Sequence, residues 1–144
     1  MAQSLDAALG TPKYYIDTPG KKDGEKYFWF PTRGDSMTCH GGGHSIPGGS
    51  LVLGRWVKVQ ALTDVPLQRP VVVIIDDNGQ QFCMLKVAVG VTPAENSEYG
   101  TDQLILHSYN KRYNDFTIPF HCMKFLFVVE RVRLPDGEEF TVDD

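Results

Sequence analysis

The dipeptide Asn78-Gly79 separates two apolar segments, and it is the feature that most constrains the fold of this chain. The segment before it, residues 71–75, consists only of Val and Ile, and residues 80–89 form a second strand-like segment after it. Asn-Gly between two such segments is the strongest short signal for a β-hairpin. The sequence therefore predicts an antiparallel pair of strands in the middle of the chain.

Other segments of β-type composition recur along the chain. Fourteen Gly and nine Pro residues are spread among them, which indicates many turns. No stretch of ten residues keeps a 3.6-residue hydrophobic period, so we expect neither a long helix nor a helix-turn-helix. The sequence predicts an all-β domain. Its further strands are expected at residues 27–30, 50–59, 103–108, 116–118, 123–134 and 140–142.

Length and composition fit a single globular domain. The chain has 144 residues, of which 42% are hydrophobic and 22% are charged. Residues 14–26 are rich in Gly, Lys and Asp and contain the turn signals Pro19-Gly20 and Asp23-Gly24. We expect residues 1–24 to form a flexible arm and residues 25–144 to form the folded domain.

Charge and cysteine content limit the classes of partner. A net charge of -4 and a pI near 5.5 argue against direct binding of nucleic acid. The odd count of three cysteines favours free thiols in a reducing cytoplasm. The longest apolar segment, residues 71–75, is too short to span a bilayer, and the first ten residues do not resemble a secretory signal. We expect a cytoplasmic protein without a membrane contact.

The sharpest chemical motif is Gly34-Asp35-Ser36-Met37, directly after an expected strand. A glycine before a serine allows close approach of a substrate, and the turn exposes the hydroxyl. Backbone N–H groups of Ser36 and Met37 are candidates for an oxyanion hole. Serine is a weak nucleophile, so it needs a base such as a lysine that burial has made neutral. On its own, this motif is also compatible with an ordinary turn.

The order of the segments that follow Ser36 adds to the motif. A loop leads into a strand, then come the Val-rich hairpin, a strand with Lys86, and a final hydrophobic strand. In this order the chain resembles the LexA/UmuD peptidase family and its phage-repressor relatives over about residues 27–133. Type I signal peptidases share the Ser-Met turn but carry a membrane anchor. The matching segments are residues 46–53, 71–75, 106–110 and 125–132.

The resemblance implies a strongly bent β-sheet of the LexA C-terminal type, a homodimer, no cofactor, and a role in SOS-type or prophage regulation. It also implies that Ser36 is the nucleophile and that the substrate is a peptide segment, from the chain's own arm or from a partner protein. The cut bond would precede a glycine. Leu9-Gly10 is the best candidate bond in the arm, and Pro19-Gly20 is the second.

The position of the lysine leaves two alignments open. Counting from the hairpin places Cys83 at the family's lysine position, whereas Lys86 lies three residues further along. Side chains alternate along a strand, so Cys83 and Lys86 are expected on opposite faces unless a bulge intervenes. With Lys86 as the base, the chain is a Ser–Lys peptidase. Without it, the chain is an inactive domain that serves dimerisation or interaction, with Cys83 as a buried apolar residue.

The segment Cys39-His40-Gly41-Gly42-Gly43-His44 supplies a third, metal-binding hypothesis. Cys39, His40 and His44 carry zinc-ligating atoms, but a structural site needs four ligands. Consecutive glycines favour a solvated loop instead, so we expect no metal. Either histidine could also act as a base for Ser36, although residues so close along the chain rarely aim at one point.

Overall fold

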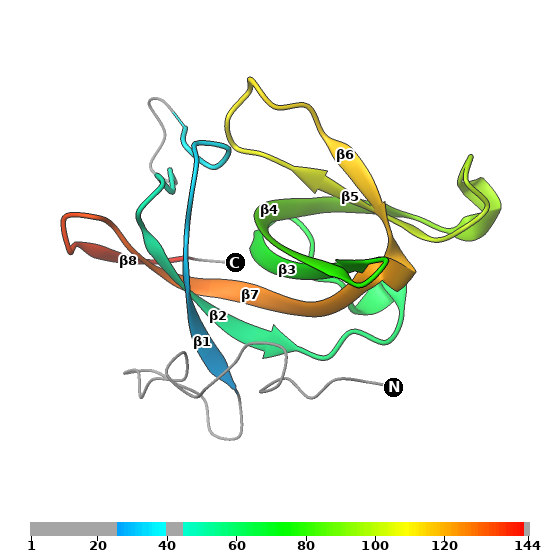
Figure 1. Ribbon diagram of the computed structural model, residues 1–144, viewed down its shortest axis with the longest axis horizontal. Helices are drawn as coiled ribbons and strands as arrows, with labels where there is room; N and C mark the ends of the chain where they lie inside the picture. Colours follow the sequence, from blue (N-terminus) through cyan, green and yellow to red (C-terminus); the bar gives the residue numbers. More distant parts are fainter. Residues whose placement is uncertain (1–25, 40–44, 143–144) are drawn as a thin grey trace.

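The computed structural model describes residues 26–39 and 45–142, and it is mainly β (Figure 1). The described residues form one antiparallel sheet of eight strands that does not close into a barrel, so the all-β prediction is confirmed. No helix in these residues is long and apolar enough to cross a membrane. The strands are β1 (Tyr27–Pro31), β2 (Leu51–Val57), β3 (Pro70–Asp77), β4 (Gln80–Thr92), β5 (Gln103–His107), β6 (Phe116–Pro119), β7 (Met123–Arg133) and β8 (Glu139–Thr141).

The order of strands across the sheet is β1-β2-β7-β3-β4-β5-β6, and β8 pairs with β7. Figure 1 shows that the sheet is strongly bent. The pairing register shifts between Leu53 and Gly54, between Ile74 and Ile75, and between Ala88 and Gly90. Such irregularities raise the local twist, and they account for a sheet that curls rather than lying flat.

The hairpin predicted at Asn78-Gly79 is present. Asn78 has φ +53° and Gly79 has φ +85°, as the two central positions of a type I′ turn require. Asp77 pairs with Gln80 across the turn, and the register then continues without a shift to the pair of Pro70 and Val87. β3 and the first half of β4 therefore form one regular ladder.

Both faces of the central strands are buried. Val72 and Ile74 pack on one face in a cluster with Phe127, while Val71 and Val73 pack on the other face. On the first face, the ring centroid of Phe127 lies 4.8 Å from that of Phe30. A strand that is buried on both sides needs apolar residues at every position, which explains the unbroken Val and Ile segment.

Candidate functional site

The Ser36 turn follows the end of β1 and is closed by its own backbone. The N–H of Thr38 donates to the carbonyl oxygen of Asp35 at 3.0 Å, so Ser36 and Met37 are the central residues of the turn. Gly34 has φ +73°, a backbone conformation that glycine adopts without a steric penalty. The Met37 side chain is buried in the core beneath. The motif is thus a tight turn whose second central residue anchors it.

A second loop supports this turn from outside. A Cβ atom at Gly48 would lie only 2.6 Å from the carbonyl oxygen of Gly34, so the two backbones are in direct contact. The hydroxyl of Thr32 donates to the carbonyl oxygens of Pro47, at 3.1 Å, and of Ser50, at 3.0 Å. These contacts fix the path of the chain from β1 to Ser36.

A third support comes from the loop after β5. The backbone N–H of Asn110 donates to the carbonyl oxygen of Ser36 at 2.9 Å, and its side-chain amide donates to the carbonyl oxygen of Asp35 at 3.0 Å. The hydroxyl of Tyr113 donates to the carboxylate of Asp35, which raises the pKa of this tyrosine. Residues 110–113 therefore hold the Ser36 turn from the side of β5.

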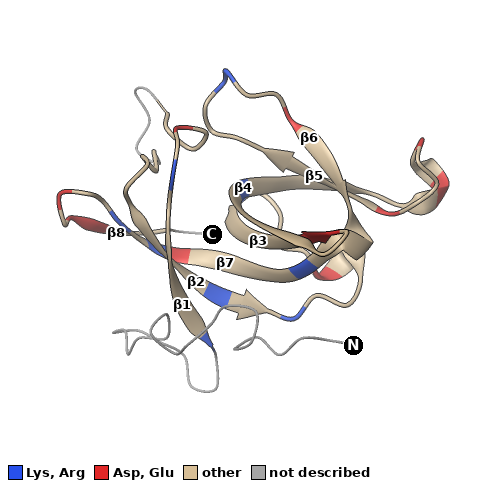
Figure 2. Ribbon diagram, viewed as in Figure 1, with Lys and Arg blue, Asp and Glu red and all other residues tan. Residues whose placement is uncertain are grey.

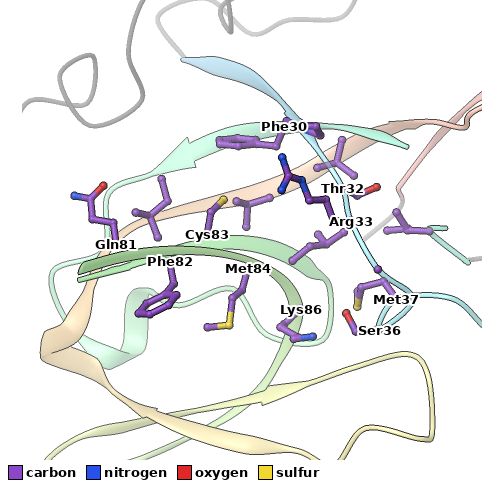
Figure 3. Close-up of a pocket in the computed structure, with 17 residues that line it drawn as sticks. Phe30, Thr32, Arg33, Ser36, Met37, Gln81, Phe82, Cys83, Met84 and Lys86 are labelled. Atoms are coloured by element: carbon purple, nitrogen blue, oxygen red, sulfur yellow. The ribbon is translucent and has the colours of Figure 1, made fainter. Parts of the chain in front are cut away.

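A cavity of about 620 Å³ lies between the Ser36 turn and the first half of β4. Ser36, Met37, Cys83 and Lys86 all line it, so the structure brings the candidate nucleophile and both lysine-position candidates to one cavity (Figure 3). Its floor is apolar and belongs to the core. The floor residues are Phe30, Ile46, Val52, Val72, Ile74 and Leu85.

Cys83 and Lys86 lie on opposite faces of β4, as strand alternation predicts. Cys83 pairs with Ile74 and Lys86 pairs with Val71, and the register has no shift between them. Lys86 still lines the cavity, because its long side chain extends at the edge of the sheet. In Figure 3 its amine points toward the Ser36 hydroxyl, whereas the Cys83 thiol points to the other side of the strand. No bulge is needed for the lysine to line this space.

The environment of Lys86 favours its neutral form only in part. Burial lowers the pKa of Lys86 below its ordinary value, because the charged ammonium loses contact with water. Its Nζ also lies 5.9 Å from the ring centroid of Tyr113, a cation–π distance that favours the charged form. No hydrogen bond joins Lys86 Nζ to the Ser36 hydroxyl among the described residues, although both residues line the cavity.

Cys83 is exposed, yet neighbouring residues partly shield its thiol from water. This desolvation raises the pKa of the thiol. A raised pKa lowers the fraction of thiolate, which is the nucleophilic form of cysteine. The prediction that Cys83 is a buried apolar residue is therefore wrong, because its side chain is exposed. The environment nevertheless disfavours a reactive thiolate, as in an ordinary unactivated cysteine.

The oxyanion candidates, the backbone N–H groups of Ser36 and Met37, have no acceptor among the described residues. Among the described residues, no hydrogen bond uses the backbone N–H of Ser36 or of Met37. Backbone N–H groups near a protein core are nearly always paired. Two neighbouring donors that no described acceptor uses, beside a serine hydroxyl, are the arrangement that an oxyanion requires.

Residues 82–86 of β4 also form an edge of the sheet that the structure describes. β4 pairs with β5 only from Val87 to Thr92, so residues 82–86 have β3 on one side and no strand of the described chain on the other. The same residues form a wall of the cavity. A free edge offers backbone donors and acceptors to an extended peptide.

Several sequence candidates lie outside the described residues. These include the candidate bonds Leu9-Gly10 and Pro19-Gly20, as well as His40 and His44. Cys39 is described, and its backbone N–H donates to the Ser45 hydroxyl at 2.9 Å. Within residues 26–39 and 45–142, no group of three or more His, Cys, Asp or Glu residues gathers as a metal site would.

Sequence reasoning missed Arg33 and Tyr113 as members of the site. Arg33 lines the cavity and Tyr113 contacts both Asp35 and Lys86. Tyr113 lies in a loop and is 46% exposed. Arg33 directly precedes the Gly-Asp-Ser motif, and this proximity was the one available signal.

Comparison with known proteins adds no further assignment. No family model matches the chain, and no curated protein or solved structure matches it either.

Proposed function

We propose that this chain is a Ser–Lys peptidase-like domain of the LexA/UmuD type, with Ser36 as nucleophile and Lys86 as general base. One observation carries the proposal: a lysine whose pKa is lowered by burial lines the same cavity as a serine on a tight, supported turn. Perturbed lysines in clefts are enriched at catalytic sites. Their neutral amine is a competent base for a serine hydroxyl.

The chemistry follows from these groups. The neutral amine of Lys86 takes the proton of the Ser36 hydroxyl as Oγ bonds to the carbonyl carbon of a peptide. The amides of Ser36 and Met37 donate to the oxyanion that forms. The ammonium of Lys86 then returns the proton to the leaving amine, and the C–N bond breaks. Water, deprotonated by the same amine, releases the acyl group and restores Ser36.

The free edge of β4 supports an extended peptide as the substrate. A peptide that pairs with residues 82–86 would lie along the cavity wall, with side chains alternating between the apolar floor and solvent. Its carbonyl carbon would approach Ser36 from the open side of the cavity. The apolar floor suits the Ala and Leu residues of such a segment.

The substrate proposed first is the chain's own arm, cut at Leu9-Gly10, within a homodimer that takes part in SOS-type or prophage control. Incubation of the purified protein at alkaline pH tests this. Intact-mass analysis over a day should reveal loss of the N-terminal segment, and the Ser36→Ala and Lys86→Met variants should stay uncut. If the wild type keeps its N-terminal segment at every pH, as both variants do, the proposal is wrong.

The alternative function is a catalytically inactive module for dimerisation or interaction. It is favoured by the contact between Lys86 Nζ and the Tyr113 ring, because a lysine held there in its charged form cannot accept a proton. In that case the alkaline incubation leaves the chain intact. Sedimentation would still report a dimer.

A further inference from the structure

The cavity is positively charged in a negatively charged protein. The chain has a net charge of -4, yet the described cavity lining contains Arg33 and Lys86 and no Asp or Glu. Figure 2 shows acidic residues mainly at turns and connections, including those around the β3–β4 turn and β8. The carboxylate nearest along the chain, Asp35, does not line the cavity and accepts the hydrogen bond from Tyr113.

Arg33 is the permanent cation of this pair, because a guanidinium does not deprotonate in proteins. Arg33 lines the cavity, and in the view of Figure 3 its guanidinium lies on the side of β4 to which the Cys83 thiol points. It makes no hydrogen bond or salt bridge with any residue that the structure describes. No described residue therefore uses its donors, and they are available to an occupant of the cavity that Arg33 lines.

We propose that the cavity binds an extended peptide whose acidic side chain pairs with the Arg33 guanidinium, so that Arg33 selects acidic segments. Arginine donates two parallel hydrogen bonds to a carboxylate, which gives such a contact both strength and geometric specificity. The position of the acid relative to the cut bond rests on the function proposed above. Binding of the acidic peptide does not depend on it.

The arm of this chain has the matching pattern. Asp6 precedes the candidate bond at Leu9-Gly10 by three residues, and Asp17 precedes Pro19 by two. Three residues of extended chain span about 10 Å. Arg33 and Ser36 line the same cavity. A segment that binds with its carbonyl at Ser36 can therefore bring an acidic side chain into the cavity that the guanidinium lines.

Two synthetic peptides and the full chain with Ser36→Ala test the proposal without any turnover. Both peptides span residues 4–12, carry an N-terminal acetyl and a C-terminal amide, and differ only in Asp6→Asn. The first peptide therefore has a single charge. Titration calorimetry or fluorescence anisotropy measures both dissociation constants. The chain's own arm competes with both peptides equally, so their ratio is unaffected.

We expect the Asp6 peptide to bind about tenfold more tightly than the Asp6→Asn peptide, because it gains one charge-assisted hydrogen-bonded contact with Arg33. Arg33→Gln should abolish the difference, and added salt should reduce it. Lys58→Gln, which removes an exposed charge outside the cavity lining, should preserve it. Equal binding of the two peptides, absence of binding, or a ratio that survives Arg33→Gln would overturn the proposal. If the ratio holds while the wild-type protein never cuts, the peptidase function alone fails.

Discussion

The backbone N–H of Asn110 donates to the carbonyl oxygen of Ser36 at 2.9 Å, across 74 residues of sequence. This bond, with the two that join Asn110 and Tyr113 to Asp35, ties the loop after β5 to the turn that carries the hydroxyl. Lys86 lies on β4, the strand that pairs with β5. The candidate nucleophile is thereby held in a fixed relation to the strand of its candidate base.

Replacing Asn110 by Ala should loosen this connection. The change removes the side-chain bond to Asp35 and the one that Asn110 accepts from Arg112. We expect the free energy of unfolding to fall by about 1–2 kcal/mol and the rate of self-cleavage to fall several-fold. Urea denaturation and intact mass measure the two effects. Asn96→Ala, on an exposed 3-10 turn, is the matched control, and equal effects of both changes would contradict the role of Asn110.

Lys86 predicts a dependence of stability on pH. Burial lowers the pKa of Lys86 in the folded chain below the ordinary 10.5. Between the lowered pKa and 10.5, the unfolded chain therefore binds more protons than the folded chain. The free energy of unfolding therefore rises with pH in this window, and charging Lys86 destabilises the fold below it.

Lys86→Met should consequently be more stable than the wild type near pH 7, and the gain should vanish above pH 10.5. Urea denaturation of both proteins between pH 7 and 11 measures the difference. Lys58→Met, at an exposed position, serves as the control. A constant difference across the whole range would show that Lys86 is not desolvated.

Tyr113 should set the pH at which cleavage begins. Its ring favours the charged form of Lys86, so Tyr113→Leu should shift the rate–pH profile down by roughly 0.3–0.7 unit. Tyr113→Phe keeps the ring and loses the hydrogen bond to Asp35, so its profile should stay in place while the maximal rate falls. Identical profiles for the two variants would show that the ring does not act on Lys86.

Cys83 offers a probe of the cavity. Because its pKa is raised, it should react slowly with iodoacetamide near pH 7, and its rate should rise about tenfold per pH unit up to that pKa. Mass spectrometry of a Cys39→Ser, Cys122→Ser protein isolates this thiol. A bulky maleimide on Cys83 should block binding of the acidic peptide, whereas Cys83→Ser should not. Unchanged binding after complete labelling would separate Cys83 from the binding cavity.

Local patterns in the sequence predicted the strands, because the apolar and β-branched residues that a buried strand needs are adjacent along the chain. The Asn78-Gly79 turn and the Val-rich segment of β3 needed no long-range information. The last strand was harder to assign, since its short segment does not specify a partner. β8 pairs with β7 of the same chain.

The site could be predicted only in part. Alternation along β4 correctly placed Cys83 and Lys86 on opposite faces, but it could not show that a side chain as long as lysine lines the cavity from the sheet edge. The contacts of Tyr113 and the open position of Arg33 depend on how distant loops meet. No local pattern encodes such a meeting.

A serine-directed fluorophosphonate tests the central claim most directly, because it measures activation of Ser36 without any knowledge of the cut bond. The account predicts one adduct per chain, on Ser36, that forms faster as pH rises toward the pKa of Lys86 and is lost in Lys86→Met. A wild-type chain that stays unlabelled at every pH, or labels as fast without the lysine, would contradict it.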